Sequence, residues 1–548
     1  MNTPRRHDVP LEERIIGFHL RRRRDESADR RFLVVGERTW TFREADSDAR
    51  AFARGLQREG INRGDHVVLM LPNCAEFVLA WFGISLIGAV TIPIDPRQSG
   101  TLLEYKLGDA RPRCLVIARE LLPALATVTA DSMASVACLV IVDGMNADLE
   151  PQAQLPAAAA PRRIAWADAL VAEGPDPEVV ADYRDINMVM YTSGSSGPAK
   201  GVLMPNAHTF SSGLAMLRAV DLRDHDVLFT PFPLFHGMAS RIGVLPALVA
   251  GVPVVVGERF SASAYWEQAH ACKATIGIVV PTISKLLMAQ PPGKFDRGHR
   301  VRAMFNSKPD AGFEERFGTE LIESYGMTEI SQVISAPYAE RRTGSCGRVQ
   351  AYWDVKLLGE DGVEVPQGEI GEIVARPQLP GIMMAGYLNK PEETARALRD
   401  GWFHTADFGY FDAEGYFFFT GRAAERIRRL GENISAQQIE RIVESHPAVA
   451  EAAALPYPSP LGEDDVRLIL SLKDGAALTA EALYVWMAEK LPRFMLPRYI
   501  EFLARLPRTE SGKVAKIALI GTALGAAAWN SGEASRRAPM GATSSVGR

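Results

Sequence analysis

The sequence contains little cysteine and no large excess of charge of either sign. Its 548 residues include five cysteines, which lie far apart and form no Cys-x-x-Cys pair. This usage argues against a disulfide framework and a cysteine-based zinc site, and it favours the reducing cytoplasm. The formal net charge is −5, so no global basic field would attract nucleic acid or an anionic membrane. The apolar (47%) and charged (23%) contents exclude intrinsic disorder for most of the chain.

Long hydrophobic runs are also scarce, and the exception is Phe77–Ile94, with 18 residues and no charge. That length approaches a membrane span. Gly88 and Pro93 interrupt the run, so we expect a buried helix, a glycine turn and a buried strand instead. The first 31 residues are charged throughout and lack the apolar core of a secretory signal. Their arginine run, Arg21–Arg24, fits a solvated helix face or a frayed arm.

The remaining sequence alternates between short apolar strands and amphipathic helices up to about residue 340. Runs such as Cys114–Ala118 and Cys138–Val142 are typical of parallel strands buried on both faces. Beyond residue 340 hairpin patterns with glycine turns dominate. The pattern predicts an α/β protein, in which a large N-terminal body of two α/β layers and a β-rich subdomain precedes a small α+β C-terminal domain. The expected parts are an N-terminal arm at 1–30, a large domain at 31–421, a small domain at 422–527 after a hinge at 422–424, and a disordered tail at 528–548.

The strongest local signal is a loop rich in glycine and hydroxyl residues between two apolar strands, at Tyr191–Gly201. Small residues let backbone N–H groups approach an oxyanion, the hydroxyls add donors, and Lys200 adds a positive charge. The loop is not a Walker A motif, because Lys200 is followed by glycine and not preceded by one. Taken alone, the motif would also fit a flexible surface loop. The residues expected to contact a polyphosphate are Thr192, Ser193, Gly194, Ser195, Ser196, Gly197 and Lys200.

This loop resembles the phosphate loop of the adenylate-forming enzymes, the superfamily of acyl-CoA synthetases, peptide-synthetase adenylation domains and luciferases. Four further segments resemble motifs of that superfamily in the same order: Tyr325–Glu329, Asp407, Thr420–Arg422 and Pro507–Lys513. The resemblance covers about residues 30–520, and five ordered motifs are far more specific than one glycine-rich loop. The segments GIMMAGYLNKPEETARAL and RRLGENIS look most similar to bacterial ligases grouped with carnitine/crotonobetaine-CoA ligases.

The resemblance implies a reaction in two steps. A carboxylic acid attacks ATP to form acyl-AMP and pyrophosphate, and a thiol then displaces AMP. The first step brings two anions together, so Mg²⁺ and lysines must offset their repulsion. Glu329 is the candidate Mg²⁺ ligand, because a hard cation prefers carboxylate oxygen; a surface ion pair is the alternative. Thr328 would bond the α-phosphate, and Tyr325, with Gly326 in the same nucleotide-binding motif, would flank adenine.

Further roles implied by the resemblance fall near and within the C-terminal domain. Asp407 would accept hydrogen bonds from two ribose hydroxyls, and Arg422 would support the same sugar or phosphate. Lys513 would reach between the substrate carboxylate and the α-phosphate during adenylation. The family rotates its small, mobile domain between the two steps, which would remove Lys513 and bring a thiol tunnel lined by Gly431 and Glu432 to the adenylate. In isolation, Asp407, Arg422 and Lys513 would fit ordinary solvated charges.

Other positions add one candidate and four departures from the family pattern. His236 resembles a position that lines the path to the acyl pocket and could gate the thiol, although a core histidine is the alternative. Ala424 replaces the usual Asp or Lys of the hinge, and Asn306–Pro309 replaces a Gly-Gly-Ala-Pro-type strand beside adenine. Pro198–Ala199 departs within the phosphate loop, and Ala406 replaces a common glycine before the ribose aspartate.

We therefore expect a cytoplasmic, ATP-dependent, AMP-forming acyl-CoA synthetase that uses ATP, Mg²⁺ and CoA on a small-molecule carboxylic acid, with no nucleic-acid partner and no membrane span. Two departures adjoin the nucleotide and one lies at the hinge, so one alternative is a ligase that only thioesterifies a pre-formed acyl-adenylate. A second alternative loads the acyl group onto a separate carrier protein. A third is a nucleotide-binding protein without catalysis, against which Lys200, Glu329 and Lys513 argue.

Overall fold

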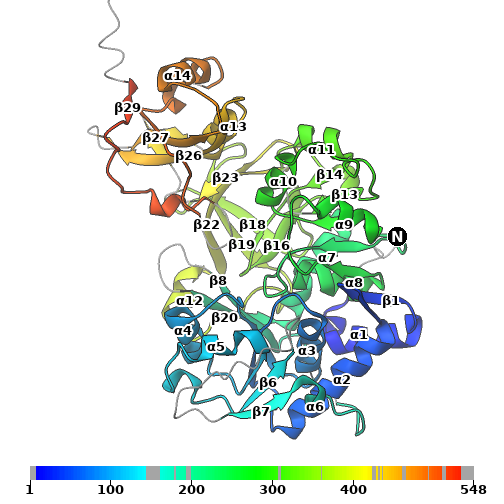
Figure 1. The fold of residues 1–548 in the computed structure, drawn as a ribbon. Helices are drawn as coiled ribbons and strands as arrows, with labels where there is room; N and C mark the ends of the chain where they lie inside the picture. The colour runs from blue at the N-terminus through cyan, green and yellow to red at the C-terminus, as the bar shows by residue number, and fades with distance from the viewer. Residues whose placement is uncertain are drawn as a thin grey trace, which may run out of the picture. The chain divides into compact units, whose positions relative to one another are not determined.

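The chain divides into two compact units, Met1–Val355 with Ala375–Phe403 and Lys356–Val374 with His404–Arg548 (Figure 1). The expected hinge residues 423 and 424 and the end of the expected tail lie outside the described residues, so those boundaries stay predictions. The computed structural model describes residues 8–143, 161–177, 181–192, 199–305, 310–359, 361–422, 427–429, 432–434, 436–459, 464–491, 493–508 and 514–531.

An eight-stranded sheet forms one layer of the first unit, in the order β20-β9-β8-β4-β3-β5-β6-β7. The pairs from β8 to β7 are parallel, whereas β9 is antiparallel to both β8 and β20. Its central strands are apolar and buried along their whole length, as expected for parallel strands covered on both faces. The strands are β3 (His66–Met70), β4 (Val90–Pro93), β5 (Cys114–Ala118), β6 (Cys138–Val142), β7 (Arg162–Ala165), β8 (Ile186–Thr192), β9 (Lys200–Pro205) and β20 (Gly386–Tyr387).

The uncharged segment 77–94 forms the helix, turn and strand that its sequence predicts. Helix α3 (Ala75–Leu86) is buried on all sides, and β4 follows it. Gly88 separates them with a φ of 68°, a left-handed conformation that glycine adopts at little cost. No helix in the described part of the chain has the length and apolar character that a membrane crossing requires.

A second, seven-stranded sheet of the same unit has the order β14-β13-β12-β10-β11-β1-β2. All its pairs are parallel except that of β1 with the edge strand β2. With the first sheet it forms the two α/β layers that the alternating pattern predicts. Its strands are β1 (Arg31–Val35), β2 (Arg38–Thr41), β10 (Leu228–Thr230), β11 (Val254–Val256), β12 (Ile276–Ile278), β13 (Ala303–Phe305) and β14 (Glu320–Ile322).

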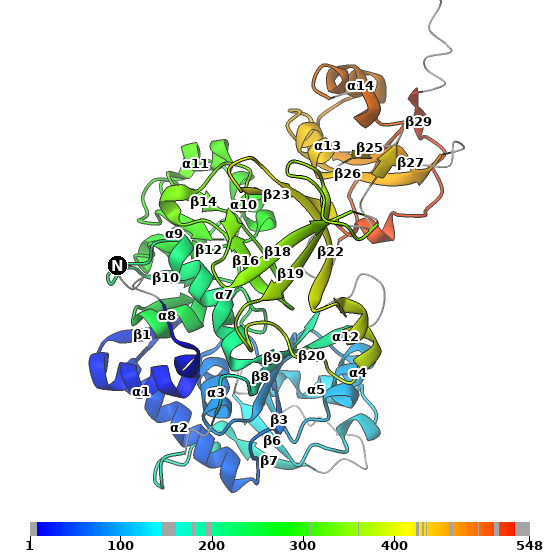
Figure 2. The same cartoon turned by 180° about the vertical axis from the view of Figure 1, so that it is seen from behind.

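Helices cover these sheets, and α1 (Ile16–Ser27), α2 (Phe42–Arg58) and α3 pack on one another (Figure 2). Within the arginine run of α1, Arg21 and Arg22 are exposed, but Arg23 is buried. Its Nε and Nη2 donate to the carbonyls of Leu248 and Val249 at 3.1 and 2.6 Å. Those carbonyls lie in the last turn of α8 (Leu245–Ala250), where a cation is favourable. The other helices of this unit are α4 (Gly100–Ala110), α5 (Leu122–Leu125), α6 (Trp166–Ala169), α7 (Asn206–Ala219), α9 (Tyr265–Ala271), α10 (Pro281–Met288), α11 (Ala311–Phe317) and α12 (Pro391–Ala397).

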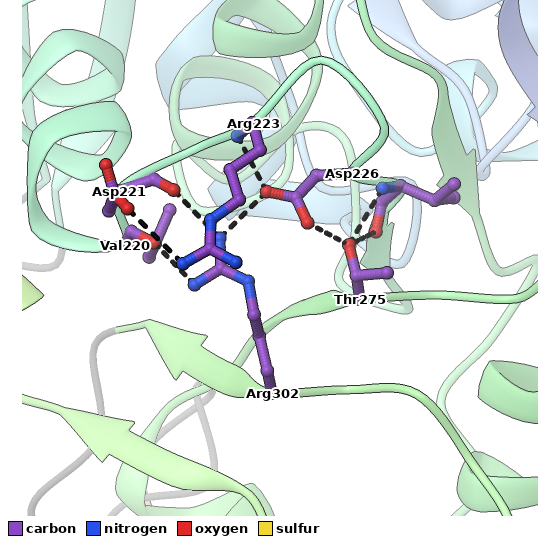
Figure 3. Close-up of polar contacts among 7 residues, drawn as sticks. Val220, Asp221, Arg223, Asp226, Thr275 and Arg302 are labelled. Carbon is purple, nitrogen blue, oxygen red and sulfur yellow. Dashed lines mark hydrogen bonds and ion pairs between the residues drawn. The ribbon is translucent and has the colours of Figure 1, made fainter.

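A buried polar network joins the starts of three strands in the second sheet (Figure 3). Arg302 Nη2 donates to Asp226 Oδ2 at 2.8 Å, and its Nη1 donates to the Val220 carbonyl at 2.7 Å. Thr275 Oγ1 donates to the other Asp226 oxygen at 2.7 Å. Burial acts to raise the pKa of Asp226, but the hydrogen bonds from Arg302 and Thr275 hold it below its ordinary value. The network fixes the beginning of β10, β12 and β13 around one ionised carboxylate.

The second unit has a small α+β fold, as its sequence predicts. Two helices lie against a four-stranded sheet of order β26-β27-β28-β29. Its core contains Ile439 and Val443 of the first helix, Leu468 and Leu470 of β27, and Leu483 of the second helix. The elements are α13 (Ala436–Glu444), β26 (Val449–Pro458), β27 (Asp464–Leu472), α14 (Ala480–Ala488), β28 (Tyr499–Phe502) and β29 (Trp529–Asn530), preceded by the hairpin of β22 (Trp402–Phe411) with β23 (Phe417–Arg422) and by the pair β24 (Ile427–Arg429) and β25 (Glu432–Ile434).

Candidate active site

The two ends of the predicted phosphate loop face each other across a β-ladder. Thr192 ends β8, Lys200 begins β9, and their Cα atoms are register partners. Thr192 Oγ1 also donates to the Lys200 carbonyl at 3.5 Å. The strand pair therefore places Lys200 at the mouth of the loop. Five further predicted loop residues, Ser193, Gly194, Ser195, Ser196 and Gly197, lie outside the described residues.

A distant segment adds an aromatic ring and a carboxylate to Lys200. Strand β20 pairs with β9, so that Tyr387 is the register partner of Val202. Lys200 Nζ lies 4.7 Å from the ring centroid of Tyr387 and 3.1 Å from Glu393 Oε2. The hydrogen bond from Lys200 lowers the pKa of Glu393 below its ordinary value. Lys200 thus has a carboxylate partner whose side chain is 32% exposed and which an incoming anion can replace.

Tyr387 connects this lysine to the predicted magnesium ligand. Its hydroxyl donates to Glu329 Oε1 at 3.0 Å, and the Met384 amide donates to the Glu329 carbonyl at 2.9 Å. Burial first, and then the Glu329 charge, raise the pKa of Tyr387, so the phenol stays protonated and donates. Glu329 is itself only 6% exposed. The alternative of a surface ion pair for Glu329 is therefore wrong.

Glu329 lies in the tight turn between β15 (Ser324–Met327) and β16 (Ser331–Ser335), which form a hairpin to which β17 (Arg348–Val349) adds a third strand. Tyr325 is buried. A Cβ on Gly326 would lie 2.0 Å from the Ser331 carbonyl oxygen, so only glycine fits there. Ser331 has a φ of 62°. The motif's residue types thus follow from the close approach of its own two strands.

His208 of α7 supports this hairpin, and sequence reasoning did not identify it. Its Nε2 lies 2.8 Å from the Thr328 carbonyl, and its Nδ1 lies 2.9 Å from the Ile382 carbonyl. Burial, and secondly the positive charge of Arg241, lower the pKa of His208 to about 4, so the ring is neutral at pH 7. A lone histidine in an apolar helix carries no signal of such contacts in the sequence, because its partners are 120 and 174 residues away.

His236 is exposed and is not a core histidine, which excludes the alternative for that residue. Its Nδ1 accepts a hydrogen bond from the Met238 amide at 3.3 Å. The chain then enters a π-helical segment, Ser240–Val244, which runs into α8. The sequence predicts a helix from Arg241 to Ala250, but not its widened first turn.

The predicted ribose site belongs to the second unit. Asp407 is 4% exposed, and its amide donates to Thr405 Oγ1 at 3.0 Å. Asp407 and Arg422 are register partners across β22 and β23. Ala406 has a φ of 55°, which is strained for a residue with a Cβ and explains why the family commonly has glycine there. The side chains of Arg422 and Glu432 are outside the described part of the structure, as are residues Ala424, Gly431 and Lys513.

The predicted magnesium site has Glu329 as its single carboxylate ligand. Among the described residues, no group of three or more His, Cys, Asp and Glu side chains is arranged to hold a metal. Mg²⁺ in nucleotide sites takes one or two carboxylates and completes its shell with phosphate oxygens and water. One buried carboxylate near a lysine of the phosphate loop is consistent with that type of site.

The fold and these contacts define an adenylate-forming enzyme, with two α/β layers, a phosphate-loop strand pair and a glycine-dependent hairpin that carries a buried acid. The family described as AMP-binding enzyme matches residues 20–388, and its C-terminal domain matches residues 438–513. The chain belongs to the AMP-binding enzyme family.

Curated relatives and solved structures agree with this assignment. The chain is 30% identical over 524 residues to a crotonobetaine/carnitine–CoA ligase of Proteus mirabilis, covering 91% of this chain and 98% of the relative. It is 31% identical over 473 residues to the ligase of the same name from Salmonella typhi, covering 83% and 88%. Two solved structures show the same fold: the anthranilate CoA ligase AuaEII with anthranoyl-AMP (TM-score 0.82, 24% identity, 93% and 97% covered) and ATP-bound MatB from Rhodopseudomonas palustris (0.78, 23%, 92% and 98%).

The protein is therefore an AMP-forming acyl-CoA synthetase, as its sequence predicts, and ATP and CoA fit as its substrates. The relatives do not favour thioesterification alone or carrier loading. Of the departures from the family pattern, Asn306–Pro309 and Ala424 lie outside the described residues.

Proposed function

We propose that this chain uses Lys200, Tyr387 and Glu329 as one connected site that binds Mg²⁺-ATP and activates a small-molecule carboxylic acid for transfer to CoA. The observation that carries the proposal is the continuous contact from Lys200 through the Tyr387 ring and hydroxyl to Glu329. A cation and an acidic metal ligand joined in this way suit a polyphosphate and its counter-ion.

Each residue has a distinct role in this proposal. Lys200 exchanges Glu393 for a phosphate oxygen, and Tyr387 keeps Glu329 oriented. Glu329 would hold Mg²⁺, which when bound offsets the negative charge of the triphosphate. Thr328, whose carbonyl His208 contacts, presents its hydroxyl to the α-phosphate.

The remaining roles rest on the family motifs. Tyr325 and Gly326 border adenine, while Asp407 and Arg422 bind the ribose. Lys513 orients the reacting carboxylate, and Gly431 and Glu432 line the thiol path. His236, which is exposed in the turns that follow β10, borders that path. CoA is the proposed acceptor because the curated relatives are named CoA ligases. All five cysteines are free thiols, which supports the cytoplasm as the proposed location.

Pyrophosphate release with a panel of carboxylic acids, followed by thioester formation with CoA, tests this function. Glu329→Gln should lower pyrophosphate release about 100-fold or more, because a lost charge in the polyphosphate site is costly. Tyr387→Phe should raise the apparent Mg²⁺ requirement. Glu392→Gln, an equal charge change at an exposed residue of α12, is the matched control. Normal release by Glu329→Gln, or release independent of any added acid, would contradict the proposal.

A further inference from the structure

Arg241 is a buried arginine that has no acidic partner among the described residues. It lies in the π-helical segment after His236, and it is 5% exposed. Its Nη1 donates to Ser212 Oγ at 3.3 Å, and its Nε has no hydrogen-bond partner within the described residues. Among the described residues, no carboxylate lies within ion-pair distance of the Arg241 guanidinium. A buried charge without a partner is unfavourable for folding, so its presence calls for another explanation.

The guanidinium lies where three elements of the candidate site meet. Ser212 of α7, which bonds Arg241, also shares a 2.6 Å hydrogen bond with Ser331 at the start of β16. On the opposite edge, a Cβ built on Gly237 would lie 2.9 Å from Arg241 Nε and 3.0 Å from Nη2. Arg241 is thus enclosed by α7, by the hairpin that carries Thr328 and Glu329, and by the turn after His236.

The charge of Arg241 persists in this setting. Burial lowers the pKa of Arg241 to about 10, and Glu329 acts against that shift, so the group is protonated at pH 7. His208, the other titratable group near it, is neutral. Glu329 is the acid whose field reaches Arg241, but it already accepts a hydrogen bond from Tyr387 and is the proposed Mg²⁺ ligand. Once Glu329 serves a metal ion, Arg241 has no anion of its own.

We propose that Arg241 determines substrate class by binding a second carboxylate of the acid substrate, remote from the carboxylate that is activated. This inference rests on the proposed function. The Nε and Nη2 atoms form the edge of a guanidinium that binds a carboxylate with two parallel hydrogen bonds. Ser212 occupies the remaining Nη1, whereas Nε and Nη2 have no hydrogen-bond acceptor among the described residues. A dicarboxylic acid supplies the missing counter-charge.

The test compares dicarboxylic acids with monocarboxylic acids of equal length, such as succinate with butyrate, glutarate with pentanoate and adipate with hexanoate. The wild-type chain should give a higher kcat/KM with at least one diacid than with its monoacid partner. Arg241→Met should lower kcat/KM for that diacid about 100-fold, because the site then leaves a buried carboxylate unpaired, while the monoacid changes only a few-fold. The kcat/KM of Arg241→Lys for that diacid should lie between the values of the wild type and of Arg241→Met, since lysine keeps the charge but loses the planar edge.

Arg14→Met is the matched control. Arg14 is equally buried, its pKa is likewise lowered to about 10 by burial, and its Nε bonds the Val9 carbonyl. It should leave the ratio of diacid to monoacid turnover unchanged.

Three outcomes separate the possibilities. A wild-type chain that turns over monoacids as well as diacids overturns the proposal, and so does an Arg241→Met variant that lowers both classes equally. If Arg241→Met does not fold, the wild-type preference and Arg241→Lys decide. If no acid of any class supports pyrophosphate release, the proposed function fails, and this inference falls with it.

Discussion

Arg467 in the second unit and Arg241 in the first are both almost completely buried, but their surroundings differ. Arg467 Nε donates to Glu501 Oε1 at 2.6 Å, its Nη1 donates to the Thr522 carbonyl at 2.8 Å, and its Nη2 donates to the Ala523 carbonyl at 3.2 Å. Arg241 has one hydroxyl acceptor. A cation whose nitrogens all have acceptors holds a fold together, whereas one with unused donors is suited to a ligand.

The comparison predicts its largest effect at Arg467. Arg467→Met leaves Glu501, whose side chain is 9% exposed, as a buried charge without a cationic partner, although its Oε2 still accepts from the Gly525 amide. We expect the free energy of unfolding of the second unit to fall by about 3–5 kcal/mol. Urea unfolding followed through Trp486 or Trp529 fluorescence measures it. The double variant Arg467→Met with Glu501→Leu should recover much of the lost stability. If Arg467→Met alone lowers the free energy of unfolding by less than about 1 kcal/mol, Arg467 is not the structural residue that the comparison requires.

Removing the carboxylate that Arg302 and Thr275 share should give a smaller loss of stability, and that loss should depend on pH. Asp226→Asn should destabilise the first unit by about 1–3 kcal/mol at pH 7, because Arg302 loses its charged acceptor. The pKa of Asp226 is lowered in the folded state, so its stabilisation is present above an unfolded-state pKa of about 3.9 and is lost as the pH falls through the folded value. Urea unfolding at pH 7 and at acid pH should therefore show the variant and the wild type converging in acid. Asp131→Asn, at an exposed residue, is the control, and a gap that persists in acid contradicts the prediction.

Arg241→Met should change the stability of the first unit by no more than about 1 kcal/mol, in either direction. Replacing a buried charge that has no acidic partner with an apolar side chain is often neutral or stabilising. Ser212 keeps its hydrogen bond to Ser331. The same urea assay, run beside Arg467→Met, sharpens the comparison directly. A loss as large as that of Arg467→Met would mean that Arg241 is a structural residue.

The smallest effect on stability should come from the exposed pair of Lys200 and Glu393. Their side chains are 27% and 32% exposed, so Glu393→Gln should cost less than about 1 kcal/mol. The same change should lower the KM for ATP a few-fold, because the triphosphate no longer competes with a carboxylate for Lys200. Pyrophosphate release at varied ATP checks this, with Glu392→Gln as the neighbouring control. An unchanged KM in both variants would show that Lys200 is not exchanged.

Much of the fold follows from local patterns in the sequence. Apolar runs such as Cys114–Ala118 become buried strands, and α13, β26, β27 and α14 form the small α+β domain that the sequence predicts after residue 422. The π-helical turn at Ser240–Val244 was not predicted, because the spacing of apolar residues does not show where the backbone hydrogen bonds of a helix change from the α to the π pattern. The φ of 55° at Ala406 was also hidden, since alanine is rare in that conformation.

The site was predictable only where a motif is local. The loop around Lys200 was identified from its residues, whereas the segment around Glu329 was identified through the family resemblance, to which the segment containing Tyr387 and Glu393 also contributed. Nothing in the sequence indicated that Tyr387 bonds Glu329, because 58 residues separate them and the contact depends on the pairing of β20 with β9. The burial of Arg241 was equally invisible, since a charged residue in a helix is usually solvated.

The close approach of Gly237 to Arg241 has a consequence for inheritance. A Cβ at position 237 would lie 2.9 Å from Nε and 3.0 Å from Nη2 of Arg241, so the guanidinium would have to shift away from this turn. A glycine at this position therefore helps to set where the guanidinium lies. A relative that keeps both residues should share this chain's choice of acid.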